Sequence, residues 1–139
     1  MNQTDILLPV LALVGWTLLI MLLIPYQRFR AAFAGKVTAK DFRYGESGRV
    51  PGEVSLPNRN YMNLLEAPLL FYVVCIALFV LQTVDTLALA LAWAYVGSRV
   101  LHSLVHVTYN NVYHRLTIFV ISNIILLVLW AQLLMILLK

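Results

Sequence analysis

The chain contains four long apolar stretches, each of about the length that a helix needs to cross a membrane. Residues 6–24 carry no charged side chain, and at about 1.5 Å per residue they span roughly 28 Å, close to the about 30 Å hydrocarbon core of a bilayer. Similar stretches follow at 62–81, 86–107 and 116–138, and mean hydropathy is +0.86 over 139 residues. We predict an all-α integral membrane four-helix bundle: one domain over residues 1–139, with helices at about 6–25, 59–81, 86–111 and 116–138.

The positive charges predict the orientation of the chain. Most of the ten basic residues lie in or beside the long connection 27–57, and Arg115 lies between the third and fourth helices. By the positive-inside rule both connections face the cytoplasm, and both termini lie outside. Because these charges flank membrane segments and belong to no recognition module, nucleic acid is not expected as a partner. Asp85, just before the third helix, is a candidate N-cap.

The expected location is the inner membrane of a bacterium. The chain is compact, has no retention signal, and has a single cysteine, Cys75, which cannot form an intramolecular disulfide.

A polar stripe marks the start of the second helix. At 100° per residue, Arg59, Asn63 and Glu66 fall at relative angles of about 0°, 40° and −20°, so they share one face. Unpaired charges at the edge of a membrane are costly and indicate a functional site. The alternative interpretation is an interhelical ion pair that fixes packing.

The third helix carries a second polar face, formed by Arg99, His102 and His106. This face ends on the same side of the membrane as the polar stripe and Arg115. The combined site is rich in arginine, which predicts an anionic ligand, because guanidinium groups bind carboxylates bidentately. Glu66 with Asn63 is suited to an ammonium or amide group. A small peptide-like molecule with two carboxylates and an amine fits this pattern.

The spacing of the polar stripe (arginine, three residues, asparagine, two residues, glutamate) resembles the MAPEG family, the membrane-associated proteins in eicosanoid and glutathione metabolism. The segment 95–102 is similar to the microsomal prostaglandin E synthase and glutathione transferase branch. Arg115 stands at that branch's spacing for the arginine implicated in thiolate activation, and 41–45 resembles its cytoplasmic loop.

The resemblance implies a homotrimer that binds glutathione between neighbouring subunits. It also implies an arginine contact from the first helix, from Arg28 or Arg30. When this arginine is combined with the residues of the two polar faces, the expected glutathione-binding residues are Arg30, Arg59, Asn63, Glu66, Arg99 and His102. The expected catalytic residues are Arg115 and His106, the latter standing where better-known members have a tyrosine, for which Tyr109 is a possible substitute.

The predicted function is glutathione-dependent attack on a lipophilic electrophile or hydroperoxide that arrives through the membrane lipid. A guanidinium beside a thiol lowers its pKa from about 8.5 and so favours the thiolate; Arg115 is the candidate for this role. His102 or His106 is suited to donate a hydrogen bond to sulfur or to move a proton.

Three alternatives remain open. His102 and His106 have the spacing of a helical metal pair, but a third ligand would have to be Glu66 or the more distant His114, so no metal is expected. A noncatalytic scaffold of the same fold would keep similar binding residues. A small transporter is less consistent with the sequence, because drug-proton exchangers are expected to have an acidic residue in the first helix, and 6–24 has none.

Ser122 and Asn123 are expected to make interhelical hydrogen bonds.

Overall fold

The computed structural model describes residues 2–138, and this part of the chain contains helices and no β-strand. The four long helices are α1 (Leu7–Phe33), α2 (Gly52–Val80), α3 (Thr86–Val107) and α4 (Val112–Leu137). Two short 3₁₀-helices, η1 (Gln3–Ile6) and η2 (Ala39–Phe42), precede α1 and follow it. All four α-helices are long and apolar enough to cross a bilayer, which confirms the predicted all-α membrane bundle.

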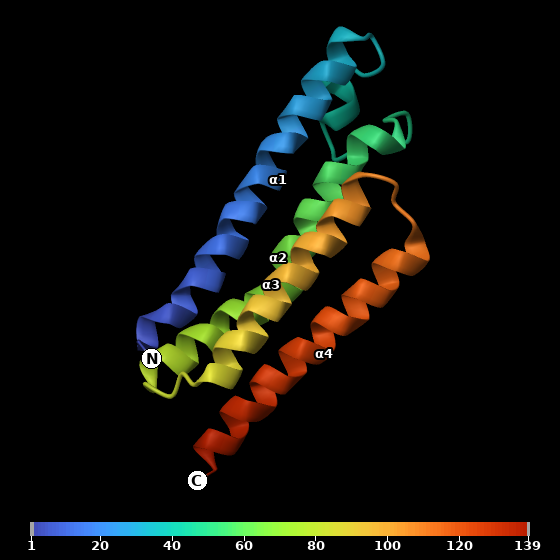
Figure 1. The fold of residues 1–139 in the computed structure, drawn as a ribbon. Coiled ribbons are helices and arrows are strands. Elements are labelled where there is room, and N and C mark those ends of the chain that lie inside the picture. The colour runs from blue at the N-terminus through green and yellow to red at the C-terminus, as the bar shows by residue number, and fades with distance from the viewer. Residues whose placement is uncertain (1, 139) are drawn as a thin grey trace.

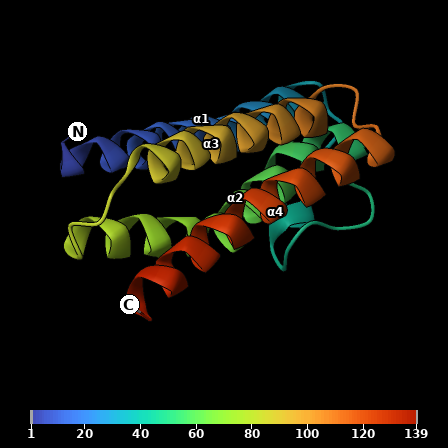
Figure 2. The same cartoon turned by 60° about the horizontal axis from the view of Figure 1, so that its bottom comes forward.

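The helices run up and down, so that the connections lie at two opposite ends (Figure 1). We call one end the loop end; it carries the connections 34–51 and 108–111. The other, the turn end, carries the N-terminal residues, the short α2–α3 connection and the end of α4. Helix α1 packs mainly on α2, and α4 packs mainly on α3. Figure 2 shows α1 and α3 in one layer above α2 and α4, with α4 diverging toward its C-terminus.

Two helices extend further toward the loop end than their sequence patterns predict. Helix α1 continues past Pro25 to Phe33, and α2 begins at Gly52, well before 59. These extra turns pack on each other through a small apolar cluster in which Ala31, Val37 and Val54 are buried. This contact outweighs the loss of one hydrogen bond at a proline inside a helix.

The α3–α4 connection has the expected length but lies one helical turn earlier in the chain, at 108–111. Helix α3 ends at Val107, not near 111, because Asn110 adopts a left-handed conformation with φ of 48°. Asn111 then caps α4, since its side-chain oxygen accepts hydrogen bonds from the N–H groups of Tyr113 and His114 at 3.0 and 3.2 Å. Helix α4 therefore starts at Val112, one turn before the predicted position.

At the turn end, side chains tie three helices together. Asp85 is the N-cap of α3, as predicted: its Oδ1 accepts from Ala88 N at 2.7 Å, and it also accepts from Gln132 Nε2 on α4 at 2.8 Å. The amide of Gln3 pairs with both backbone groups of Val84, at 2.7 and 3.2 Å.

The connection 34–51 is ordered around one carboxylate. Asp41 is nearly buried and accepts hydrogen bonds from Thr38 N at 2.8 Å, Thr38 Oγ1 at 2.9 Å and Ser47 Oγ at 2.9 Å; Arg49 Nε lies 3.6 Å away. These bonds, first that from the Thr38 backbone, hold the pKa of the Asp41 carboxyl below its ordinary value. The loop is therefore a folded element that depends on an ionised Asp41.

Candidate functional site

The interior of the bundle holds a fully buried arginine. Arg99 on α3 has an exposed fraction of 0%. Its Nη2 donates to the Asn63 backbone oxygen on α2 at 2.9 Å, and its Nη1 donates to Ser122 Oγ on α4 at 3.3 Å. The guanidinium also lies 5.4 Å from the centre of the Phe119 ring. Arg99 therefore links three helices. Ser122 makes the interhelical bond expected of it, whereas Asn123 bonds only within its own helix.

A second buried polar contact lies nearby. Asn60 Nδ2 donates to Ser103 Oγ, and both side chains have an exposed fraction of 0%. Asn60 is not predicted as a site residue from the sequence, because it follows Arg59 by one residue and so lies on a different face of α2. The Asn60 amide is directed toward α3, and this direction is known only once the packing of α2 on α3 is seen.

Next to these contacts, α2, α3 and α4 border an open cavity of about 240 Å³ at the loop end, which we call the Arg115 cavity. Its lining combines three predicted site residues with an apolar wall from α4: Asn63, His102, Arg115, Val112, Leu116 and Phe119. The folding of α2, α3 and α4 thus brings Asn63, His102 and Arg115 together.

Arg115 is fixed in place by the sharp turn before it. Its Nη1 donates to Asn110 Oδ1 at 2.7 Å, so the left-handed residue that ends α3 also orients the guanidinium. Arg115 Nε is buried and has no hydrogen-bond partner among residues 2–138. Because Arg115 lines the cavity, its guanidinium group is suited to bind an anion there.

His106 lies one turn from His102 on α3, with 5.9 Å between the ring centres. Only 1% of His106 is exposed, and its Nδ1 is buried without a partner in the described part of the chain. It does not line the Arg115 cavity in a single chain; it packs behind His102. Tyr109, considered as a substitute for the family tyrosine, is exposed and pairs its hydroxyl with His114 Nδ1 at 3.0 Å.

The polar stripe adjoins the Arg115 cavity through Asn63, but it faces outward. Arg59 and Glu66 are exposed on α2, and Asn63 Nδ2 donates to the Arg59 backbone oxygen at 3.0 Å. Within residues 2–138, neither Arg59 nor Glu66 forms an ion pair, so the interhelical pair considered as an alternative is not made inside one chain. Two opposite charges at the edge of a membrane helix thus have no ion-pair partner among residues 2–138.

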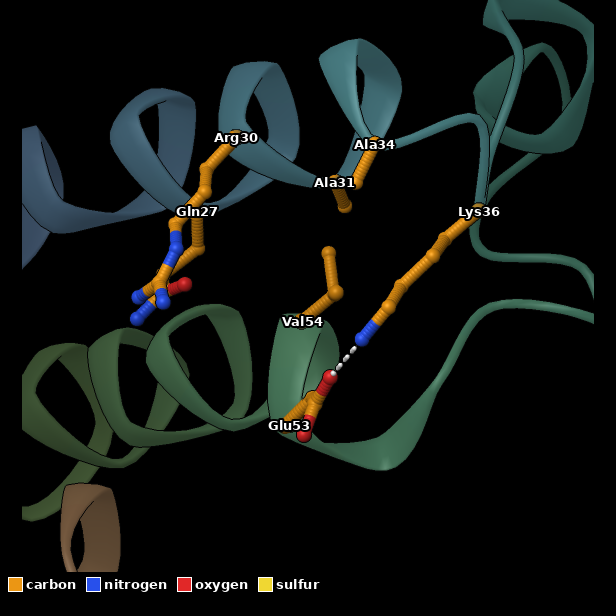
Figure 3. A pocket seen from close by; sticks show the side chains of 7 residues that line it. All are labelled: Gln27, Arg30, Ala31, Ala34, Lys36, Glu53 and Val54. Carbon is orange, nitrogen blue, oxygen red and sulfur yellow. Dashed lines mark hydrogen bonds and ion pairs between the residues drawn. The ribbon is translucent and has the colours of Figure 1, made fainter.

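The arginines at the end of α1 lie apart from this site. Arg28 Nη2 pairs with Glu46 Oε1 at 3.1 Å, and its guanidinium stacks on Phe42 at 4.5 Å. Arg30 points into a separate space between α1 and α2, next to Gln27, and Val54 on α2 lines the same space (Figure 3). At 100° per residue the polar stripe lies about 120–180° around α2 from Val54. In one chain, Arg30 is therefore not brought to the predicted glutathione-binding residues.

The metal alternative finds no support in the arrangement of ligands. Among residues 2–138, no three His, Cys, Asp or Glu side chains are close enough together to hold a metal ion. His114, the possible third ligand, is turned toward Tyr109.

The arrangement therefore offers cationic donors around a small space with an apolar wall. At about 240 Å³ the Arg115 cavity is smaller than the roughly 300–1,000 Å³ of most ligand pockets. The exposed stripe beside it supplies further polar groups.

Comparison with known proteins identifies one related family. One family model, described as the MAPEG family, matches residues 6–135, which covers nearly the whole chain and all four helices. No curated protein and no solved structure matches the chain in the same comparisons. The family match and the four-helix membrane fold together support a glutathione-related function in a membrane. The chain belongs to the MAPEG family.

Proposed function

We propose that this protein is a glutathione-dependent membrane enzyme that uses the glutathione thiol against a lipophilic electrophile or hydroperoxide. The observation that carries the proposal is the Arg115 cavity, which the Arg115 guanidinium lines together with His102 and Asn63 beside the exposed polar stripe. The similarity of segment 95–102 to the prostaglandin synthase and glutathione transferase branch supports the same activity.

The residues present fit glutathione. It carries two carboxylates, one ammonium group and one thiol, and the site offers two guanidinium groups, from Arg59 and Arg115, and one free carboxylate, from Glu66. Arginine binds carboxylates through two parallel hydrogen bonds, and Glu66 complements an ammonium group. Asn63 belongs to the polar stripe and also lines the Arg115 cavity, so its amide can contact glutathione at either place.

We further propose that the site is completed in a homotrimer. Arg59 and Glu66 are exposed in one chain although they lie at the edge of a membrane helix, and a neighbouring copy packed on α2 would bury them together with the ligand. The loop end then faces the cytoplasm of a bacterial inner membrane, because most basic side chains gather there.

The chain's own residues would divide the chemistry. Bound glutathione supplies a nucleophilic sulfur. Arg115, held by Asn110, stabilises negative charge at that sulfur and so lowers the pKa of the thiol. His102 is placed to accept the thiol proton or to hydrogen-bond the sulfur, with His106 behind it. Val112, Leu116 and Phe119 exclude water and provide the apolar wall for the second substrate.

Calorimetry of the purified protein with glutathione tests the binding site. We expect Arg59→Ala and Glu66→Gln each to weaken binding about tenfold or more, since each removes a charge-assisted contact. Arg43→Ala, which alters an exposed loop arginine stacked on Tyr44, is the control and should bind normally. Normal binding in both stripe variants would refute the assignment.

Activity assays separate an enzyme from a scaffold. Conjugation of glutathione to an activated aryl halide forms a carbon–sulfur bond and releases halide and the thiol proton. Reduction of a lipid hydroperoxide by two glutathione molecules yields an alcohol, water and glutathione disulfide. We expect at least one of these reactions. Measurable glutathione binding without either would favour a noncatalytic scaffold of the same fold.

A further inference from the structure

We propose that the connection 34–51 docks onto an anionic membrane surface through three side chains, Lys40, Arg43 and Tyr44, which we call the η2 ridge. All three are exposed, and Tyr44 has an exposed fraction of 89%. None of them lines the Arg115 cavity or the space into which Arg30 points, so the ridge is separate from the proposed glutathione site. The partner is the headgroup layer of anionic phospholipids.

The short 3₁₀-helix η2 sorts its side chains onto three faces. With three residues per turn, residues three apart lie above one another. Thr38 and Asp41 face the interior of the loop, where they bond to each other at 2.8 and 2.9 Å. Phe42 packs against the small apolar cluster at the ends of α1 and α2. Lys40 and Arg43 are left together on the third face, with the Arg43 N–H donating to the Lys40 backbone oxygen at 3.3 Å.

The positive charges of the η2 ridge are not neutralised by the loop. Within residues 2–138, neither Lys40 nor Arg43 forms an ion pair. Each carboxylate in 34–53 already has another basic partner at 3.6 Å or less: Asp41 with Arg49, Glu46 with Arg28, and Glu53 with Lys36.

The η2 ridge also carries an exposed aromatic ring. The Arg43 guanidinium lies 5.1 Å from the centre of the Tyr44 ring, so a cation and an aromatic side chain project together. Basic side chains attract anionic headgroups, and tyrosine favours the interface between water and lipid. The combination therefore fits an anionic lipid surface.

The contact with Arg28 sets the level of η2 relative to the bilayer. The apolar run of α1 ends at Ile24, so Arg28 lies about 6 Å beyond the hydrocarbon core, within a headgroup layer about 5–8 Å thick. The Arg28 guanidinium lies 4.5 Å from the centre of the Phe42 ring. Helical side chains lean toward the N-terminus of their helix, which for α1 is the membrane side. Helix η2 is therefore held at headgroup level.

Two aromatic side chains on α1 support this level. Tyr26 and Phe29 are 60% and 64% exposed, and they follow Ile24 by about 3 and 8 Å along the helix. Exposed aromatic side chains at this height are typical of a membrane interface. Figure 1 shows the connection returning beside the last turns of α1, which brings η2 back toward this layer.

The test measures hydrogen exchange of the full-length protein in two nanodiscs, one of phosphatidylcholine and one of equal phosphatidylcholine and phosphatidylglycerol. The amides of Arg43 and Ser47, which bond within the loop, report its opening. We expect them to exchange about tenfold more slowly in the anionic nanodisc, since each basic residue near such a surface contributes about fivefold. Changing both Lys40→Gln and Arg43→Gln should remove most of this difference, and added salt should weaken it.

Two control variants accompany this test. Lys40→Arg combined with Arg43→Lys keeps both charges and should keep the difference between the nanodiscs. Arg49→Gln removes one charge from the same loop, beside Asp41 and not on the η2 ridge. Any loosening around Asp41 should speed exchange in both nanodiscs alike, so that their ratio stays the same.

Three results would overturn the proposal. The first is an unchanged difference between nanodiscs in the double glutamine variant. The second is an equal loss in Arg49→Gln, which would show a general attraction of the whole loop. The third is protection by a soluble acidic peptide without any effect of phosphatidylglycerol, which would make the η2 ridge a protein-docking surface. Neither nanodisc contains glutathione, so the outcome is independent of the proposed enzymatic function.

Discussion

Arg99 and Arg59 are two arginines near the same level of the bundle, yet the chain treats them in opposite ways. Arg99 is fully buried and finds Asn63, Ser122 and the Phe119 ring within its own chain. Arg59 is exposed on α2 and forms no ion pair within residues 2–138. The comparison indicates that Arg99 serves the fold, whereas Arg59 is available to a molecule that the chain does not contain.

The strongest test of this difference replaces each arginine in turn and measures the free energy of unfolding. We expect Arg99→Ala to lower the free energy of unfolding by about 2–5 kcal/mol, because it leaves a cavity and removes the donor that bonds to the Asn63 carbonyl and the Ser122 hydroxyl. Arg59→Ala should change it by about 0.5 kcal/mol or less, as for an exposed residue. Denaturant titration in detergent, followed by circular dichroism, measures both. Equal destabilisation would contradict the distinction.

The next effect concerns catalysis. Arg115→Gln should lower the rate of glutathione conjugation at neutral pH by about 10²-fold, since a charged donor no longer stabilises the developing thiolate. The pH at which the rate is half-maximal should move upward toward about 8.5, the pKa of a free thiol, and activity should recover in part at high pH. Stopped-flow rates across pH, with Arg43→Gln as the control, measure this. An unchanged pH profile would exclude Arg115 from this role.

A smaller effect tests how Arg115 is positioned. Asn110→Gly keeps the left-handed backbone that ends α3 but removes the oxygen that accepts from Arg115. We expect the conjugation rate to fall about fivefold, the value of one hydrogen bond, and the rate–pH curve to broaden or shift upward while the melting temperature stays nearly constant. A lower melting temperature with an unchanged pH profile would instead assign Asn110 a purely structural role.

The smallest effect lies in the loop. Because the folded-state pKa of Asp41 is lowered, its ionised form stabilises 34–51 above the ordinary carboxyl pKa of about 4, and this contribution is lost as the pH falls through the lower folded value. Hydrogen exchange at the Ser47 amide, which bonds to Asp41 O, should show protection that declines only in acid. Asp41→Asn should remove that dependence; if it persists, another group is responsible.

Sequence alone predicts the four helices because the thickness of a bilayer fixes their length and composition. It predicts much less about their ends, where Pro25 and the residues before 59 read as loop until Ala31 and Val54 are seen to pack together. The site is predicted in part: Asn63, His102 and Arg115 do meet, since their spacing places them at one end of the bundle.

What the sequence could not supply is the direction of each side chain between neighbouring helices. Arg99 and Glu66 both appear as charges on polar faces, but only the packing shows that one is buried and the other exposed. The same holds for Asn60, whose partner Ser103 lies on α3, and for Asn110, whose role depends on a left-handed turn that no apolar pattern encodes.

Asp85 gives the bundle a mechanical property. One oxygen of this carboxylate holds both the first turn of α3 and Gln132 of α4, while Arg115 lies at the other end of α4, roughly 26 Å away along the helix. A helix behaves as a rigid rod over this length. The hydrogen bond from Gln132 to Asp85 therefore restrains rotation of α4 about its axis. Because Arg115 lies on the same helix, a carboxylate at the turn end helps to fix the position of a guanidinium group at the loop end.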